Sequence, residues 1–467
     1  MSAQPSSSGI ERGASNFPLR PISFGDPVVN IERRDDGTIY LRPKQPLGDY
    51  PVRITDRLHH WATTTPDRVF MAEREGGRGW RKITYAELLT ASRHIASALI
   101  QRGLSAERPV VILSGNSIDH ALLAFGAFYA GVPFCPVSPA YSLVSKDYGK
   151  LSYLMKLLTP GLVFADDADK FADALAANVS LGTEIAASYG HVPGRDVTLL
   201  ADLMATPIRG DLDDVHGRIG PDTIAKFLLT SGSTGNPKAV INTQRMICAN
   251  QVMLRETLAF LKDEPPVIID WLPWNHTFGG NHNIGLTLYN GGSMYLDAGK
   301  PVPGGIEETV RNLREISPTV YFNVPKGYES LLPYLRDDQG LRAKFFDRLH
   351  ADVLLRRGAV AVRLGQPRRA RGEGEGLSRA DADRSRRDRD RAVLHVGQSA
   401  HQPLRPCRPA RLRQRRQAGA EQRQAGSARQ GAERDAWLLA PTRHHGKILR
   451  RGRILQDGRC AQARRSR

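Results

Sequence analysis

A run of glycines and hydroxyl-bearing residues closed by a lysine, LLTSGSTGNPKAV at 228–240, has the composition of a phosphate-binding loop. Gly232 and Gly235 allow a tight backbone curl, and successive N–H groups that point to one side bind anions. Four hydroxyls add further donors: Thr230, Ser231, Ser233 and Thr234. Lys238 adds a mobile positive charge for phosphate oxygens. The run is not a Walker loop, because Pro237 precedes the lysine, and composition alone leaves an ordinary surface loop as the alternative.

A second candidate lies in DWLPWNHTFGGNHNIGLTLYNGGSMYLD, residues 270–297. Its His276, between Asn275 and Thr277, could orient a carboxylate or a phosphate oxygen. The alternative is a histidine that is hydrogen-bonded within a turn.

The elements that must position these residues alternate between helical and strand patterns. Thr84 followed by Glu87 predicts a capped helix start, and Leu88, Ile95, Leu99 and Ile100 form one apolar stripe of that helix. Short apolar runs predict strands in RPVVILSGN, LVFAD, KFLLTSG, PVIIDWLPW, GSMYLD and PTVYFNVP. The alternation predicts an α/β fold of layered, largely parallel sheets with flanking helices.

Length and cysteine usage are consistent with a cytoplasmic enzyme. A chain of 467 residues can form two or three domain-sized cores, and its four cysteines show no paired spacing for zinc or disulfides. The first thirty residues lack the pattern of a signal peptide. The most apolar stretch, 120–137, contains Gly and Pro, so we expect a buried helix that leads into a strand and no membrane partner.

The positive charge is confined to one end of the chain. From Leu355 onward there are 29 Arg and one Lys against 10 acidic residues, whereas the preceding residues carry 36 basic and 38 acidic groups. Only Trp437, of 32 aromatic residues, lies beyond residue 354. A segment so poor in large apolar groups cannot offset the entropy of ordering its chain, so we expect 355–467 to be largely disordered.

The loop and the His276 segment together resemble the adenylate-forming enzymes, which include acyl-CoA synthetases, luciferases and peptide-synthetase adenylation domains. LLTSGSTGNPKAV is similar to the family's phosphate loop, with Ala239 where glycine is usual, a change we expect to be tolerated. The resemblance covers about residues 50 to 354. It implies that Lys238 and the loop Thr230, Ser231, Gly232, Ser233, Thr234 and Gly235 bind the nucleotide phosphates. It also implies an acyl pocket formed by His276, Phe278, Tyr321 and Asn323.

The sequence around LPWNHTFGGNHN is most similar to that of bacterial feruloyl-CoA synthetases, which activate hydroxycinnamic acids. The implied substrates are a small carboxylic acid, ATP and CoA, with Mg²⁺ as cofactor. The acid forms an acyl-adenylate with ATP, and the thiol of CoA then displaces AMP. No residue of this chain is identified as a ligand of the metal.

Three further features of the family cannot be read after residue 354: a Thr-Glu motif that holds magnesium, a Gly-Asp motif that holds ribose, and a small lid domain with a catalytic lysine. Back-translation with the frame moved by one base restores similar strings in order. The segment RADADRSRRDRDRA (379–392) gives VLMLTGLGATETA, GAERDAWLL (431–439) gives GPNVTPGYW, and LRRGRILQDGRCAQ (449–462) gives FDEDGFYKTGDALK. We therefore interpret 1–48 as a flexible extension, 49–354 as an incomplete large domain, and 355–467 as an out-of-frame tail without the lid.

Two functions follow from these observations. The first is an aryl-acid CoA ligase, impaired as printed. The alternative is a degenerate ligase body that acts as a binding protein, with a basic tail that holds nucleic acid. The tail has no recognisable RNA-binding motif and only one aromatic residue for stacking on bases, which argues against a nucleic-acid partner.

Overall fold

The computed structural model describes residues 22–76, 79–230, 235–356, 359–364 and 394–396. These residues divide into two compact units. The larger unit comprises 26–257 and 270–296, and the smaller unit comprises 22–25, 258–269 and the described residues from 297 onward. The chain leaves the larger unit after residue 257 and re-enters it at 270, so each unit is built from separate stretches of sequence.

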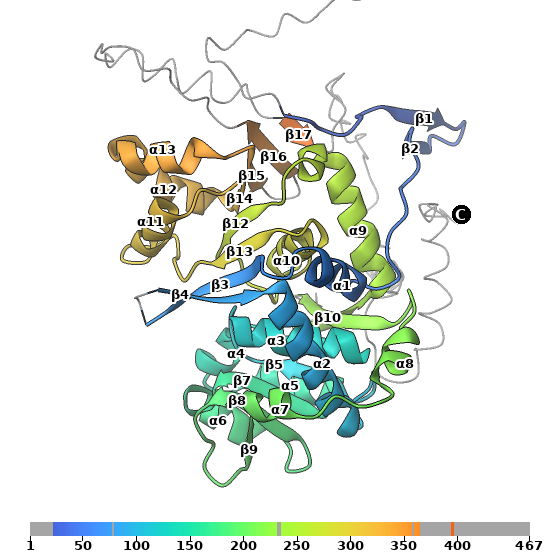
Figure 1. Cartoon of the computed structure of the whole chain (residues 1–467), viewed down its shortest axis with the longest axis vertical. Helices are drawn as coiled ribbons and strands as arrows, with labels where there is room; N and C mark the ends of the chain where they lie inside the picture. Colours follow the sequence, from blue (N-terminus) through green and yellow to red (C-terminus); the bar gives the residue numbers. More distant parts are fainter. Residues whose placement is uncertain (1–21, 77–78, 231–234, 357–358, 365–393, 397–467) are drawn as a thin grey trace, which may run out of the picture. The chain divides into compact units, whose positions relative to one another are not determined.

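A seven-stranded sheet forms the centre of the larger unit (Figure 1). Its strands are β5 (Val110–Ile112), β6 (Phe134–Pro136), β7 (Leu162–Asp167), β8 (Glu184–Tyr189), β9 (Val197–Leu199), β10 (Ile224–Thr230) and β11 (Lys238–Thr243). Their order is β11-β10-β6-β5-β7-β8-β9, and neighbours are parallel except for β10 and β11. The predicted α/β class with a largely parallel sheet is confirmed.

Helices cover both faces of this sheet. Val110 and Ile112 of β5 belong to one buried apolar cluster, whereas Val111 belongs to a second. α2 (Tyr85–Gln101) and α3 (Ile118–Ala130) contribute to the first cluster and pack side by side (Figure 1). α5 (Gly149–Leu158) and α6 (Ala168–Asn178) contribute to the second. Burial on both faces explains why these strands are continuous apolar runs.

The start of α2 and the apolar stretch after β5 match the predictions. Thr84 accepts from the N–H of Glu87 while the Glu87 carboxylate accepts from the N–H of Thr84, which is the expected capping box. Leu88, Ile95 and Leu99 are fully buried. The stretch 120–137 forms the buried α3 and then β6. None of the described helices has the length and apolarity needed to cross a bilayer.

Three further strands and seven further helical segments complete most of the larger unit. β3 (Val69–Glu75) pairs in parallel with β13 (Ser293–Leu296) and antiparallel with β4 (Gly79–Thr84). The helical segments are α1 (Thr55–Thr64), α4 (Ala140–Leu143), α7 (Leu200–Ala205), α8 (Leu212–Gly217), α9 (Gln244–Thr257), a π-helix η2 (Phe278–Asn283) and α10 (Ile284–Tyr289). β13 confirms the strand predicted in GSMYLD.

A hairpin that the sequence analysis did not predict lies within the segment assigned to the N-terminal extension. β1 (Val29–Arg33) pairs antiparallel with β2 (Ile39–Pro43). Gly37 in the connection has a φ of +82°, and the N–H of Thr38 donates to the Asp36 carboxylate. Asp-Gly between alternating residues is a hairpin signal, so the turn chemistry was readable.

The smaller unit contains a four-stranded sheet and neighbouring helices. Its strands are β14 (Val320–Asn323), β15 (Ala351–Arg356), β16 (Ala359–Leu364) and β17 (Leu394–Val396), with β14 parallel to β15 and the other pairs antiparallel. Its helical segments are η1 (Ala259–Lys262), α11 (Ile306–Glu315), α12 (Pro325–Asp337) and α13 (Gln339–Asp347). β12 (Val267–Asp270) ends where the chain re-enters the larger unit. β12 and β14 confirm the strands predicted in PVIIDWLPW and PTVYFNVP.

Two short stretches of the predicted tail form strands. β16 and β17 lie beyond Leu355, where the charge pattern led us to expect disorder. The run AVAVRL at 359–364 is apolar and β-branched, which favours pairing with β15. Residues 357–358, 365–393 and 397–467 of the tail lie outside the described residues.

Candidate active site

The predicted phosphate loop joins β10 and β11 at one edge of the central sheet. β10 ends at Thr230, β11 begins at Lys238, and these two residues pair across the hairpin. Gly235 has a φ of +88°, a left-handed conformation that glycine adopts without strain. Four predicted loop residues lie outside the described residues: Ser231, Gly232, Ser233 and Thr234.

The two faces of the β10–β11 hairpin have different surroundings. Residues that pair across antiparallel strands project to the same face. One face, which we call the lysine face, carries the pairs Lys226–Asn242, Leu228–Val240 and Thr230–Lys238. The opposite face carries Phe227 and Ala239, which are buried in the second apolar cluster. Ala239 is not one of the described non-glycine residues with a positive φ. Its backbone conformation therefore does not require the glycine that is usual in the family.

The His276 segment is a tight turn that leads into η2. The N–H of His276 donates to the carbonyl of Pro273 at 3.1 Å, and the N–H of Gly280 donates to the carbonyl of His276 at 2.8 Å. A Cβ atom added to Gly280 would lie 2.1 Å from the carbonyl oxygen of Trp274. Glycine is therefore required for the turn to close. π-Helical turns are rare and occur frequently at functional sites.

Two side chains from the region after β5 hold the start of this turn. The Asn116 amide donates to the carbonyl of Leu272 at 2.9 Å and accepts from the N–H of Trp274 at 3.0 Å. The ring of His120 meets the ring of Trp274 edge-on, with centroids 4.9 Å apart. Asn116 thus fixes both backbone groups that flank Pro273.

The lysine face contacts η2 directly. The Lys226 ammonium donates to the carbonyl of Gly280 at 2.8 Å. The Asn281 amide donates to the side-chain oxygen of Asn242 at 2.8 Å, and the amide of Gln251 on α9 donates to the carbonyl of Asn281 at 3.0 Å. The hairpin of the phosphate loop and the His276 segment are therefore joined by two hydrogen bonds, and α9 contributes a third to the same segment.

Burial changes the proton affinities around this contact. Burial lowers the pKa of Lys226 to about 7 and that of His120 to about 4. It also raises the pKa of the Cys135 thiol to about 12. On η2, burial lowers the pKa of His282 to about 4. Near pH 7, Lys226 is the member of this group that titrates.

Two predicted pocket residues on this segment have side chains that are exposed or partly exposed to solvent. His276 is exposed and Phe278 is half-buried. The ring of Phe278 lies 5.0 Å from the ring of His282. His276 can therefore reach a ligand from the surface of the turn.

Tyr321 and Asn323 lie in the smaller unit, on β14. Both are buried, and the Asn323 amide donates to the Tyr321 hydroxyl at 2.9 Å. The Tyr321 ring packs edge-on against Phe345, with centroids 5.2 Å apart. Both residues are thus engaged within their own unit.

Sequence reasoning missed the residues that hold the His276 turn or join it to its neighbours: Asn116, Lys226, Asn242, Gln251 and Asn281. The signal for Lys226 was present, because a lysine interrupts the apolar run of a predicted central strand. The amide side chains gave no comparable signal, since their partners lie far away in the sequence.

The described residues show no cluster of protein ligands that identifies a position for the implied magnesium ion. Across the part of the chain that the structure describes, no group of three or more His, Cys, Asp or Glu side chains converges as metal ligands.

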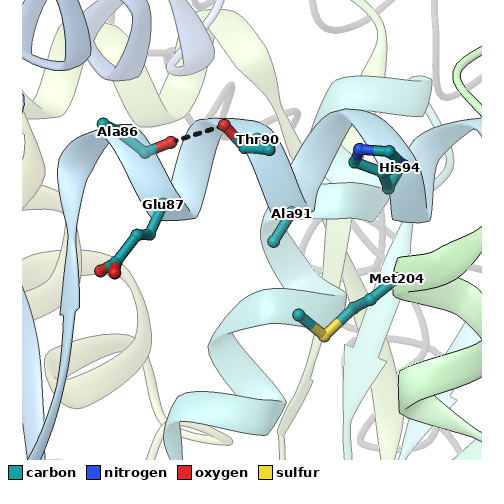
Figure 2. Close-up of a pocket in the computed structure, with 6 residues that line it drawn as sticks. All are labelled: Ala86, Glu87, Thr90, Ala91, His94 and Met204. Carbon is teal, nitrogen blue, oxygen red and sulfur yellow. Dashed lines mark hydrogen bonds between the residues drawn. The ribbon is translucent and has the colours of Figure 1, made fainter.

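A surface hollow of about 400 Å³ lies between α2 and α7. Ala86, Glu87, Thr90, Ala91 and His94 line it from α2, and Met204 lines it from α7 (Figure 2). The Thr90 hydroxyl donates to the carbonyl of Ala86 at 3.0 Å. None of the predicted site residues lines this hollow.

Comparison with known proteins places this site in context. The chain is 25% identical over 291 residues to a methyl-dioxo-octahydroindenyl-propanoyl:CoA ligase of Rhodococcus jostii (strain RHA1), which is 58% of this chain and 54% of that protein. It is 23% identical over 308 residues to the long-chain-fatty-acid–CoA ligase heimdall of Drosophila melanogaster, covering 64% of this chain and 43% of that one. The chain thus spans about half the length of these curated relatives.

Among solved structures, the fold is similar to that of a protein described as a long-chain-fatty-acid CoA ligase from Rhodopseudomonas palustris CGA009. The TM-score is 0.53 at 21% identity, over 65% of this chain and 70% of that one. The family model for AMP-binding enzymes matches residues 58–415. This match extends past Leu354, so it does not itself mark the boundary predicted there. Because it covers most of the sequence, the chain belongs to the AMP-binding enzyme family.

Proposed function

We propose that the protein is an ATP-dependent carboxylic acid–CoA ligase. In the first step, the carboxylate of the acid attacks the α-phosphate of ATP, which forms an acyl-adenylate and releases pyrophosphate. In the second, the thiol of CoA attacks the acyl carbon, loses its proton and releases AMP. The observation that carries the proposal is the packing of the His276 segment against the lysine face of the β10–β11 hairpin.

The phosphate end of the site is the end of this hairpin. Negative charge develops on the departing pyrophosphate, and preorganised donors stabilise it. Thr230 and Lys238 are paired on one face where the loop begins and ends, so a hydroxyl and an ammonium flank the loop. We assign the phosphates of ATP to this loop, including its residues 231–235.

The acyl end of the site is assigned to the His276 segment. His276 is exposed on a turn whose backbone is fixed by Asn116 and Gly280, so its position is set while its side chain stays accessible. Phe278 supplies an apolar surface beside it. We assign Tyr321 and Asn323 to the same pocket on the family resemblance alone.

We propose a hydroxycinnamic acid such as ferulate as the acid. The support is the resemblance of the sequence LPWNHTFGGNHN, residues 272–283, to feruloyl-CoA synthetases. The segment combines an apolar ring, an exposed imidazole and several amides, which suits an aromatic acid that bears polar substituents.

We also propose that the sequence beyond Leu354 is read out of register. The support is the excess of 29 Arg in that segment, its single aromatic residue, and the strings similar to family motifs that appear in order in the neighbouring frame. Residues 355–467 then do not carry the acids for magnesium and ribose, so we expect the 467-residue chain to bind substrates and turn over little or nothing.

Calorimetric titration of the purified 467-residue chain with ATP and with ferulate tests this assignment. We expect both to bind, Lys238→Met to weaken ATP, and His276→Ala to weaken ferulate. No binding of ATP or ferulate to the folded wild-type chain would contradict the ligase assignment. Feruloyl-CoA formation at the rate of an ordinary ligase would contradict the proposed impairment.

A further inference from the structure

Lys226 is a buried cation in the middle of an apolar strand. Its side chain is 3% exposed, and its neighbours Ala225 and Phe227 on β10 are also buried. The ammonium lies 5.4 Å from the centroid of the Phe134 ring on β6. Desolvation of a charge is costly, and an apolar residue of similar length would fill the same space without that cost.

The group that Lys226 holds is a backbone carbonyl next to the His276 turn. Gly280 has no side chain, so its position is set by its two peptide groups. Its N–H donates to the carbonyl of His276, and its carbonyl accepts from Lys226. The ammonium is thereby linked to His276 through a single residue of η2.

Lys226 also shares a face with the phosphate-loop residues. The lysine face carries Thr230 and Lys238 at the loop end of the hairpin, and Lys226 and Asn242 further along the same strands. Asn242 accepts from Asn281, the residue after Gly280. Two neighbouring residues of η2 are therefore tied to the same face that presents the phosphate-binding groups.

We propose that Lys226 is a positioning residue, which fixes the separation between the phosphate loop and the His276 turn through its hydrogen bond to the carbonyl of Gly280. This inference rests on the proposed function. It predicts that Lys226 matters most for a ligand that must contact both ends of the site at once. ATP contacts the phosphate loop, whereas an acyl-adenylate contacts both the nucleotide end and the acyl end.

The test compares two ligands on the full 467-residue chain: ATP, and the sulfamoyl analogue of feruloyl-adenylate, which cannot react. We expect Lys226→Met to weaken the analogue roughly tenfold or more, because misplacement by about 1 Å can have effects of this size, and to leave ATP affinity within about twofold. Asn242→Ala removes the second tie and should act in the same direction. Lys82→Met, at an exposed lysine on β4, is the matched control and should change neither affinity.

Each outcome decides between explanations. Selective loss of the analogue with an unfolding midpoint at or above that of wild type supports the positioning role. Parallel loss of both ligands with a lowered midpoint shows that Lys226 is structural, and unchanged affinity for the analogue shows that it positions nothing. Both results overturn the inference while leaving the proposed function intact. If the wild-type chain binds neither ligand, the proposed function fails and the inference fails with it.

Discussion

Replacing Lys226 by methionine should stabilise the protein at low pH and lose this effect as the pH rises. The pKa of Lys226 falls from 10.5 to about 7 on burial. At about 1.4 kcal/mol per pKa unit, the buried ammonium destabilises the fold by about 5 kcal/mol below pH 7. Loss of the hydrogen bond leaves the Gly280 carbonyl unsatisfied, at a cost of about 1–3 kcal/mol. Lys226→Met should therefore be more stable than wild type by about 2–4 kcal/mol at pH 6.

The sign of the pH dependence follows from proton binding. Between pH 7 and 10.5 the unfolded chain holds more protons at this lysine than the folded chain does, so wild-type stability rises with pH relative to the variant. The other groups facing Lys226 do not titrate between pH 6 and pH 10, because burial lowers the pKa of His120 to about 4 and raises that of Cys135 to about 12. By pH 10 the advantage of Lys226→Met should be gone or reversed.

Thermal unfolding of wild type, Lys226→Met and Lys82→Met from pH 6 to pH 10 measures this difference. The Lys226→Met midpoint should lie several degrees above wild type at pH 6, since about 1 kcal/mol corresponds to about 2–4 °C in a domain of this size. Lys82→Met should follow wild type throughout. A lower midpoint for Lys226→Met at pH 6, or a difference that does not change with pH, would refute the reasoning.

Three further predictions concern other parts of the larger unit. Lys238→Met should lower the affinity for ATP roughly 10- to 100-fold, the range expected for a lost charged hydrogen bond. Unchanged affinity in calorimetry of the folded variant would exclude a phosphate role. Gly280→Ala should lower the unfolding midpoint by about 5 °C or more, because the added Cβ would lie 2.1 Å from the carbonyl oxygen of Trp274. The control Gly217→Ala should leave the midpoint unchanged, because its Cβ would meet no atom within 4 Å. Equal midpoints for the two variants would argue against the close contact at Gly280. Burial lowers the pKa of His216 to about 4, so stability should fall as pH drops from about 6.5 to 4; His216→Phe should remove part of this loss, and a variant as acid-sensitive as wild type would contradict it.

Local sequence signals predicted the elements of the larger unit well. The Thr84 capping box, the apolar stripe of α2 and the short runs of β5, β7 and β10 each depend on residues close together in the chain. Their periodicity and turn chemistry are sufficient to define them. The β1–β2 hairpin has the same kind of local signal, Asp36-Gly37 at its turn.

The packing that forms the candidate site could not be predicted in this way. Contact between Lys226 and Gly280 joins residues 54 positions apart, and no local pattern specifies which strand face a distant turn will meet. Within η2, the backbone of Gly280 lies so close to the carbonyl of Trp274 that a Cβ atom on Gly280 would be 2.1 Å from that oxygen, a tertiary contact that no local pattern indicates. The burial of Lys226, and therefore its lowered pKa, follows from its own tertiary contact with η2 and not from the composition of β10.

The strands beyond residue 355 show a different limit. Composition averaged over the tail indicated disorder, but β16 is a short apolar run within it that pairs with β15. An average over more than a hundred residues conceals a six-residue strand. Local propensity was the better guide at that position.

The most direct test of the central claim compares the printed chain with a frame-restored chain. In the frame-restored chain, the reading frame is moved by one base after the Leu354 codon, and translation continues through the rest of the gene. Both proteins are supplied with ATP, Mg²⁺, CoA and ferulate, and the formation of AMP and feruloyl-CoA is measured. The frame-restored chain should form AMP and feruloyl-CoA only when the acid is present. The Lys238→Met variant of that chain should lose this activity, and the printed chain should show little or none. A folded, frame-restored chain that forms neither product with ferulate or any other carboxylic acid would contradict the central claim.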